Sequence, residues 1–152
     1  MSVHLKKISM KMFPIAASFF MGIALALCLV AFTRFSGTGE GYVVENDTVI
    51  AREEAGPHKG GGKTTAYPFF SRLTDLQLVF RKRTLRPGSS IGYHLQEKDE
   101  IYYILQGTGE MAMNGKTFVV RAGDAILTRP GNSHGLRPLG SDSLTLLINY
   151  LK

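Results

Sequence analysis

The stretch from Gly88 to Gly107 reads Gly-Ser-Ser-Ile-Gly-Tyr-His-Leu-Gln-Glu-Lys-Asp-Glu-Ile-Tyr-Tyr-Ile-Leu-Gln-Gly and carries three metal-ligand side chains at short, fixed intervals. Side chains on a strand alternate between its two faces, so His94 and Gln96 are expected to point to the same side. A short polar break follows. The next apolar run begins at Glu100 and predicts a second strand, which can bring Glu100 beside the first pair.

A fourth ligand candidate lies further along the chain. Residues 130–133 are Pro-Gly-Asn-Ser, a set typical of turns, so His134 is expected where a loop re-enters the sheet. Imidazole, amide and carboxylate donors without a thiolate favour one divalent ion, with Mn, Fe, Ni or Zn as candidates. The alternative is that each histidine is only a hydrogen-bonded structural residue. The joint spacing favours a metal site of His94, Gln96, Glu100 and His134.

These residues resemble the cupin superfamily, of the small single-domain cupin-2 type. Its first motif runs Gly, five residues, His, one residue, His, three residues, Glu, six residues, Gly. The first motif is matched by Gly88, His94, Glu100 and Gly107, and the second by Gly123, Gly131 and His134. The resemblance covers roughly residues 70 to 150 and implies a metal-binding barrel.

Three positions depart from the family pattern. Gln96 replaces the second His, Pro130 stands one place later than the usual Pro, and Pro138 stands where the family often has Asn. An amide oxygen is a weaker donor than imidazole, so Gln96 is expected to lower metal affinity. A degenerate cupin that has lost its metal is therefore the main alternative.

The rest of the chain also predicts strands. Short runs rich in β-branched and aromatic residues are separated by Gly, Pro and Asn. They predict strands at residues 42–50, 76–85, 100–105, 110–113, 117–121, 125–128 and 143–150. Asn114-Gly115 predicts a two-residue hairpin turn. The pattern indicates an all-β sandwich or barrel, and the resemblance implies a single double-stranded β-helix, the jelly-roll barrel. An N-terminal hydrophobic helix is expected to precede this barrel.

That helix is predicted from the first residues of the chain. Three lysines precede an apolar run of 20 residues, Phe13 to Phe32, which is long enough to span a bilayer. We expect residues 1–34 to be a signal peptide or transmembrane anchor, 35–70 a linker and Gly-rich arm, and 71–152 the cupin barrel. The basic residues at the N-terminus place the barrel on the periplasmic or extracytoplasmic side. The single cysteine, Cys28, lies in the apolar run, so no disulfide framework is expected.

The net charge of +6 is divided along the chain. Four basic residues against Glu40 give +3 before residue 41, and 14 basic against 11 acidic residues give +3 after it. This balance predicts no nucleic-acid partner. A local cluster at residues 81–83 with Arg86 is interpreted as a solvated strand edge, with an anionic ligand or lipid headgroup as the alternative.

Further residues are candidates for substrate contact. The Gly-rich segment at residues 56–65 is no phosphate-binding loop, because Pro57 stands where its first Gly should be. His58 and Lys63 in this segment could contact a substrate, although a mobile, solvated loop is the simpler interpretation. Met111 and Met113 share one strand face and are expected as core that also forms pocket wall.

Two functions remain open at this stage. The first is a metal-dependent cupin enzyme acting on a small oxygen-rich molecule such as a sugar acid or carboxylate, by isomerase, lyase or oxygenase chemistry, with Tyr102 as acid–base candidate. The second is a non-catalytic module that binds a small ligand outside the cytoplasmic membrane. Fold alone does not choose between them. A homodimer is possible in either case.

Overall fold

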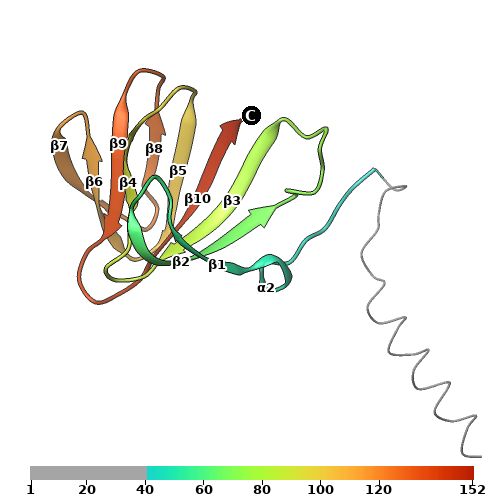
Figure 1. Cartoon of the computed structure of the whole chain (residues 1–152), viewed down its shortest axis with the longest axis horizontal. Helices are drawn as coiled ribbons and strands as arrows, with labels where there is room; N and C mark the ends of the chain where they lie inside the picture. The colour runs from blue at the N-terminus through green and yellow to red at the C-terminus, as the bar shows by residue number, and fades with distance from the viewer. Residues whose placement is uncertain (1–40) are drawn as a thin grey trace, which may run out of the picture. The chain divides into compact units, whose positions relative to one another are not determined.

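A computed structural model describes residues 41–152, which form two antiparallel β-sheets (Figure 1). The predicted anchor at residues 1–34, with its hydrophobic helix, lies outside the described residues. Within residues 41–152, no helix has the length and hydropathy that a membrane span requires. The elements in chain order are α2 (Asp47–Ile50), β1 (Arg52–Gly56), β2 (Gly61–Phe69), β3 (Leu78–Leu85), β4 (Ile91–Leu95), β5 (Glu100–Gln106), β6 (Thr108–Met113), β7 (Lys116–Arg121), β8 (Ala125–Thr128), β9 (Ser133–Pro138) and β10 (Leu144–Leu151).

The sheet order brings distant parts of the chain side by side. The six-stranded sheet runs β1-β2-β3-β10-β5-β8, and the four-stranded sheet runs β4-β9-β6-β7. Every neighbouring pair is antiparallel. The two sheets contribute opposite faces to one core, which is the jelly-roll arrangement. The expected all-β fold is therefore confirmed for residues 41–152.

The core takes apolar side chains from both sheets. Its fully buried members include Met111 and Leu136 from the four-stranded sheet and Leu85, Ile104 and Leu146 from the six-stranded sheet. Along β5, β6 and β10, buried positions alternate with more exposed ones, as a strand with one buried face requires. Burial of apolar side chains contributes roughly 1.5–3 kcal/mol each before conformational entropy is counted.

Six of the predicted strands form within two residues of their expected bounds. They are β3, β5, β6, β7, β8 and β10. The predicted hairpin turn is also confirmed, because Asn114 and Gly115 have φ of +49° and +77° between the paired residues Met113 and Lys116. Positive φ at both central residues is what a type I′ turn needs.

The strand predicted at residues 42–50 is wrong. Its second half forms the short helix α2, because the Asn46 side chain accepts a hydrogen bond from Thr48 N at 3.0 Å and caps the first turn. The pattern also gave no sign of β1 and β2. These two strands lie in the segment expected to be a linker and arm, and they extend the six-stranded sheet beyond β3.

Candidate metal centre

Three potential ligands converge from strands of both sheets. His94 on β4 and His134 on β9 are register partners in the four-stranded sheet, and Glu100 begins β5 of the six-stranded sheet. One donor atom from each of the three lies within 4.8 Å of the others. Paired strands hold two of the donors and the facing sheet holds the third, so the barrel itself sets their separation.

The ring of His94 is held by a hydrogen bond at Nδ1. Nδ1 lies 2.8 Å from the Gly92 carbonyl oxygen, which can only accept, so Nδ1–H donates. In the neutral ring, Nε2 then carries the lone pair. A histidine whose Nδ1 is bonded to the backbone in this way presents Nε2 as a fixed ligand.

His134 is oriented in the same manner. It is completely buried, and its Nδ1 lies 2.6 Å from the Thr128 hydroxyl on β8. When Nδ1–H donates to that hydroxyl, Nε2 of the neutral ring carries the lone pair. Nε2 lies 3.1 Å from Oε2 of Glu100 and 3.3 Å from the hydroxyl of Tyr102. The second nitrogen is therefore directed at the point where the three ligand candidates meet.

The surroundings of Glu100 show whether these residues fit a metal ion. Its side chain is buried, and although Oε2 lies close to His134, no hydrogen bond of acceptable geometry reaches this atom. A buried carboxylate oxygen without a partner is costly. Two imidazole nitrogens and a carboxylate oxygen form a donor set that divalent Mn, Fe, Ni or Zn accepts. The residues present fit such an ion.

Tyr102 lies beside the ligand group on the inner face of β5. Burial, followed by the negative charge of Glu100, raises the pKa of its phenol well above the usual value of 10. The hydroxyl therefore keeps its proton at neutral pH and acts as a donor. Tyr103 points outward and is exposed, as strand alternation predicts.

Two of the three candidate ligands, His94 and Glu100, line an open pocket of about 430 Å³, a volume that suits a small molecule, and His134 lies buried behind them. The predicted fourth ligand, Gln96, is half-buried and lines the same pocket. It directly follows β4, where its backbone pairs with residues 131 and 132 through bonds of 2.9 and 2.8 Å. The Pro-Gly turn and the end of β4 are thereby tied together.

The structure separates the other substrate-contact candidates. His58 lines the pocket and stacks on His94, with ring centroids 3.5 Å apart and planes 2° from parallel. Its partial burial, followed by the charge of His94, lowers the pKa of His58. Lys63 is exposed on β2 and is not among the residues that line the pocket. Met111 lies in the core and Met113 packs against it; neither lines the pocket.

A close backbone approach places His58 at the site. The loop between β1 and β2 lies against β4, where Gly92 N donates to Pro57 O at 2.9 Å and the Ser90 hydroxyl donates to Gly60 O at 2.7 Å. An ideal Cβ on Gly60 or Gly92 would lie 2.0 or 1.9 Å from a backbone oxygen of the opposite segment. Only glycine allows this approach.

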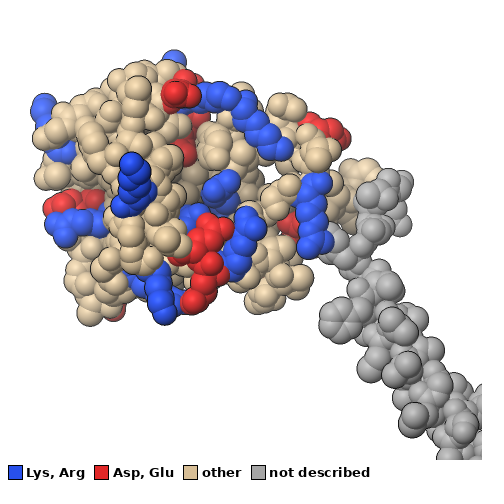
Figure 2. Space-filling model, in the orientation of Figure 1, with Lys and Arg blue, Asp and Glu red and all other residues tan. Residues whose placement is uncertain are grey.

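The basic cluster requires a correction. Its strand, β3, is not an edge but lies between β2 and β10, and the side chain of Arg83 is only 2% exposed. Arg81 and Arg83 both line the pocket, whereas Lys82 contacts Asp47 and Tyr67 on the other face. Alternation along β3 was the signal that could have identified them. Elsewhere, basic and acidic side chains are interspersed on the face that Figure 2 shows.

Comparisons with known proteins agree with this arrangement. A family model described as Cupin domain matches residues 82–150. An oxalate-binding protein of Thermotoga maritima is 33% identical over 112 residues, which cover 72% of this chain and 93% of that protein.

Solved structures give the same fold. The crystal structure of a predicted oxalate decarboxylase from Thermotoga maritima has a TM-score of 0.65 and 31% identity, covering 72% of this chain and 98% of that chain. A cupin 2 conserved barrel domain protein from Salinispora arenicola has a TM-score of 0.59 and 17% identity, covering 75% and 91%, and supports the fold alone. With the two motifs on paired strands and these relatives, the chain belongs to the cupin superfamily, in its cupin-2 type.

Proposed function

We propose that this chain binds a small carboxylate, oxalate or a near relative, at a divalent metal held by His94, Glu100 and His134. The observation that carries the proposal is the buried Oε2 of Glu100, which lacks a hydrogen bond and faces imidazole nitrogen at the wall of an open pocket. The relative named as an oxalate-binding protein supports the choice of ligand, since the alignment spans nearly all of that protein.

The chain's own residues would divide the work of binding. His94 and His134 are each fixed through Nδ1, and the Glu100 carboxylate offsets part of the metal's charge. Gln96 is the proposed fourth protein donor. The metal supplies Lewis acidity and a positive charge for carboxylate oxygens. Tyr102, which keeps its proton, is placed to donate a hydrogen bond to a ligand oxygen.

A second candidate function is turnover of the same ligand. The position of the Tyr102 hydroxyl, 3.3 Å from His134 Nε2, favours it, because a retained proton beside the ligand group can serve as a general acid. Binding and turnover differ in one measurable respect, since only an enzyme consumes the ligand.

The experiment uses full-length protein purified without a metal-binding tag, with a His94→Ala/His134→Ala double variant as its control. Metal content is measured by mass spectrometry, and oxalate is then titrated calorimetrically into metal-loaded and metal-free protein. We expect stoichiometric metal that vanishes in the double variant, and oxalate binding that requires metal. No metal after incubation with Mn(II), Fe(II), Ni(II) and Zn(II) would refute the proposal. Loss of oxalate over time would favour the enzyme.

The N-terminal sequence supports a proposal about the wider context, and a homodimer is a separate possibility. Residues 1–34 would serve as a signal peptide or membrane anchor, and the barrel would lie outside the cytoplasmic membrane, because the lysines precede the apolar run. Protease treatment of intact and broken cells tests the location, and light scattering of the purified protein tests for a homodimer.

A further inference from the structure

The pocket is also lined by positively charged side chains from β3, a strand that carries none of the candidate metal ligands. Arg81 and Arg83 occupy alternate positions on β3, so both point to the inner face of the six-stranded sheet. Their register partners on β10, Ile148 and Leu146, are both buried. Including these arginines, the pocket is lined by four basic and two acidic side chains. An inward-facing arginine pair is costly unless each charge is compensated.

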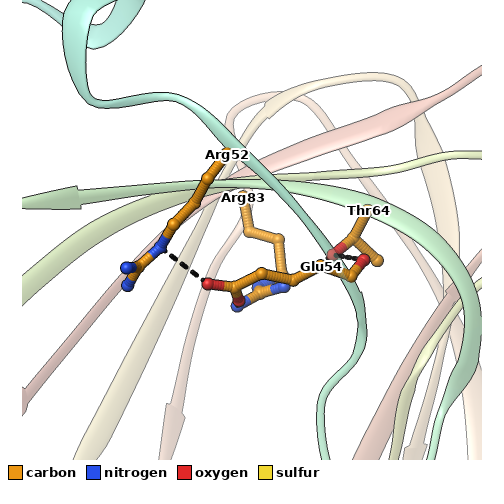
Figure 3. A network of polar contacts seen from close by, with 4 residues as sticks. All are labelled: Arg52, Glu54, Thr64 and Arg83. Atoms are coloured by element: carbon orange, nitrogen blue, oxygen red, sulfur yellow. Dashed lines mark hydrogen bonds and ion pairs between the residues drawn. The ribbon is translucent and has the colours of Figure 1, made fainter.

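The positive charge of Arg83 is compensated by other residues of the protein. Its Nη2 donates to Oε2 of Glu54 on β1 at 2.9 Å, and its Nη1 donates to the hydroxyl of Thr64 on β2 at 2.6 Å. Figure 3 shows this network, in which Arg52 also pairs with Glu54. The β1–β2 hairpin thus holds Arg83 in place and offsets its charge.

Among residues 41–152, Arg81 makes no direct ion pair, although its charge acts on the Glu54 carboxylate from a longer distance. Its Nε is buried and lacks a hydrogen bond, as does the Nε of Arg83, but within the described residues Arg81 also has no ion pair at its terminal nitrogens. Its guanidinium lies 5.9 Å from the ring centroid of Tyr150, close enough for a cation–π contact that orients the group without neutralising it. Arg81 is therefore a half-buried cation, facing the pocket, with open donor capacity.

We propose that Arg81 selects the ligand by pairing with a second carboxylate, so that the preferred ligand of this pocket is a small dicarboxylate. One carboxylate approaches the ligand group of His94, Glu100 and His134, and the other meets the guanidinium of Arg81. The planar guanidinium suits a carboxylate, because it donates two parallel hydrogen bonds. This inference rests on the proposed function and adds to it a preference for dicarboxylates over monocarboxylates and the residue that recognises the second carboxylate.

The test compares dicarboxylates with monocarboxylates on Mn(II)-loaded full-length protein. Oxalate, malonate, formate and acetate are each titrated calorimetrically into wild type, Arg81→Gln and Arg81→Lys. Arg137→Gln is the matched control, since it removes the same charge from an exposed arginine that pairs with Glu110 on β6. Metal content is measured in every sample, so that ligand binding and metal binding are read separately.

We expect Arg81→Gln to lower the affinity for oxalate and malonate roughly 10- to 100-fold, the loss typical of a hydrogen bond to a charged group. Metal content and acetate affinity should stay as in wild type. Arg81→Lys keeps the charge but not the two parallel donors, so its oxalate affinity should be intermediate. Arg137→Gln should bind as wild type does.

Other results would overturn the inference in distinguishable ways. Wild-type oxalate affinity in Arg81→Gln with metal retained overturns the role of Arg81 and leaves the proposed function standing. An equal loss for acetate and oxalate overturns the dicarboxylate assignment. If wild type binds metal but neither oxalate nor malonate, both proposals fail. Should Arg81→Gln not fold, wild-type oxalate affinity in Arg81→Lys would overturn the paired contact.

Discussion

Gly92 links the N-terminal hairpin to the candidate metal centre, and substituting it tests that link. Its N–H donates to Pro57 O in the β1–β2 loop, and its carbonyl accepts from Nδ1 of His94. In Gly92→Ala, an ideal Cβ would lie 1.9 Å from the carbonyl oxygen of His58 and 3.0 Å from Gly60 N. These contacts are with backbone, so no side-chain rotation relieves them. The loop has to move away from β4.

The expected cost follows from two contributions. Forcing extra volume into a closely packed site costs about 1–3 kcal/mol. Loss of the hydrogen bond from Gly92 N to Pro57 O, which is 2.9 Å long, adds about 0.5–1.5 kcal/mol. We therefore expect Gly92→Ala to lower the free energy of unfolding by about 2–4 kcal/mol. The ring of His58 should also leave its stacked position on His94.

Urea denaturation at equilibrium measures the free energy, and NMR of the histidine ring protons reports the stack. Gly131→Ala is the control, because Gly131 has φ of +83° but open space around its Cβ position. Its cost should be about 1–2 kcal/mol of backbone strain, with the histidine signals unchanged. If Gly92→Ala stays within about 0.5 kcal/mol of wild type, as a surface substitution does, the close-approach argument is refuted.

Two further predictions concern the supports of the site. Thr128→Val removes the partner of His134 Nδ1 and should weaken metal binding about 10- to 100-fold in a chelator competition; unchanged affinity would show that the hydroxyl does not orient the ring. Burial opposes ionisation of Glu54, but the hydrogen bond and charge of Arg83 outweigh it and hold the Glu54 pKa below 4.5. The ionised Glu54 carboxylate therefore stabilises the folded protein fully above pH 4.5, and this stabilisation is lost as the pH falls through the lower pKa of the folded state. Because the Glu54 side chain is 34% exposed, Glu54→Gln should cost about 1 kcal/mol at pH 7, in urea denaturation, and less at acid pH; a pH-independent difference would contradict this.

The predictable part of the fold was the part with regular alternation. Along β5 the burial of Glu100, Tyr102 and Ile104 follows the period of two that the sequence displays. Asn114-Gly115 predicted its hairpin because this turn depends on the backbone preferences of two neighbouring residues and not on distant contacts. The spacing of His94 and Glu100 predicted their convergence, because it is fixed by a short strand–turn–strand unit.

β1 and β2 could not be predicted in this way, since their sequence contains no alternating apolar face. The buried residue that they cover is Arg83, so their inward positions carry the polar partners Glu54 and Thr64. Small residues complete the loop, which approaches β4 at Gly92. Such pairing depends on residues about thirty positions apart, as the ion pair between Glu54 and Arg83 illustrates.

Different strands of the pocket carry the two proposed functions, metal binding and ligand selection. The candidate metal donors come from β4, β9 and the start of β5. His94 is fixed by Gly92 on its own strand, and His134 is fixed by Thr128 on β8 of the other sheet. Arg81 stands on β3, separated from β5 in the sheet by β10. Sites with no shared partner respond to substitution almost independently. Changes on β3 should therefore alter which ligand binds without altering the metal, and relatives with the same ligand group can prefer different carboxylates.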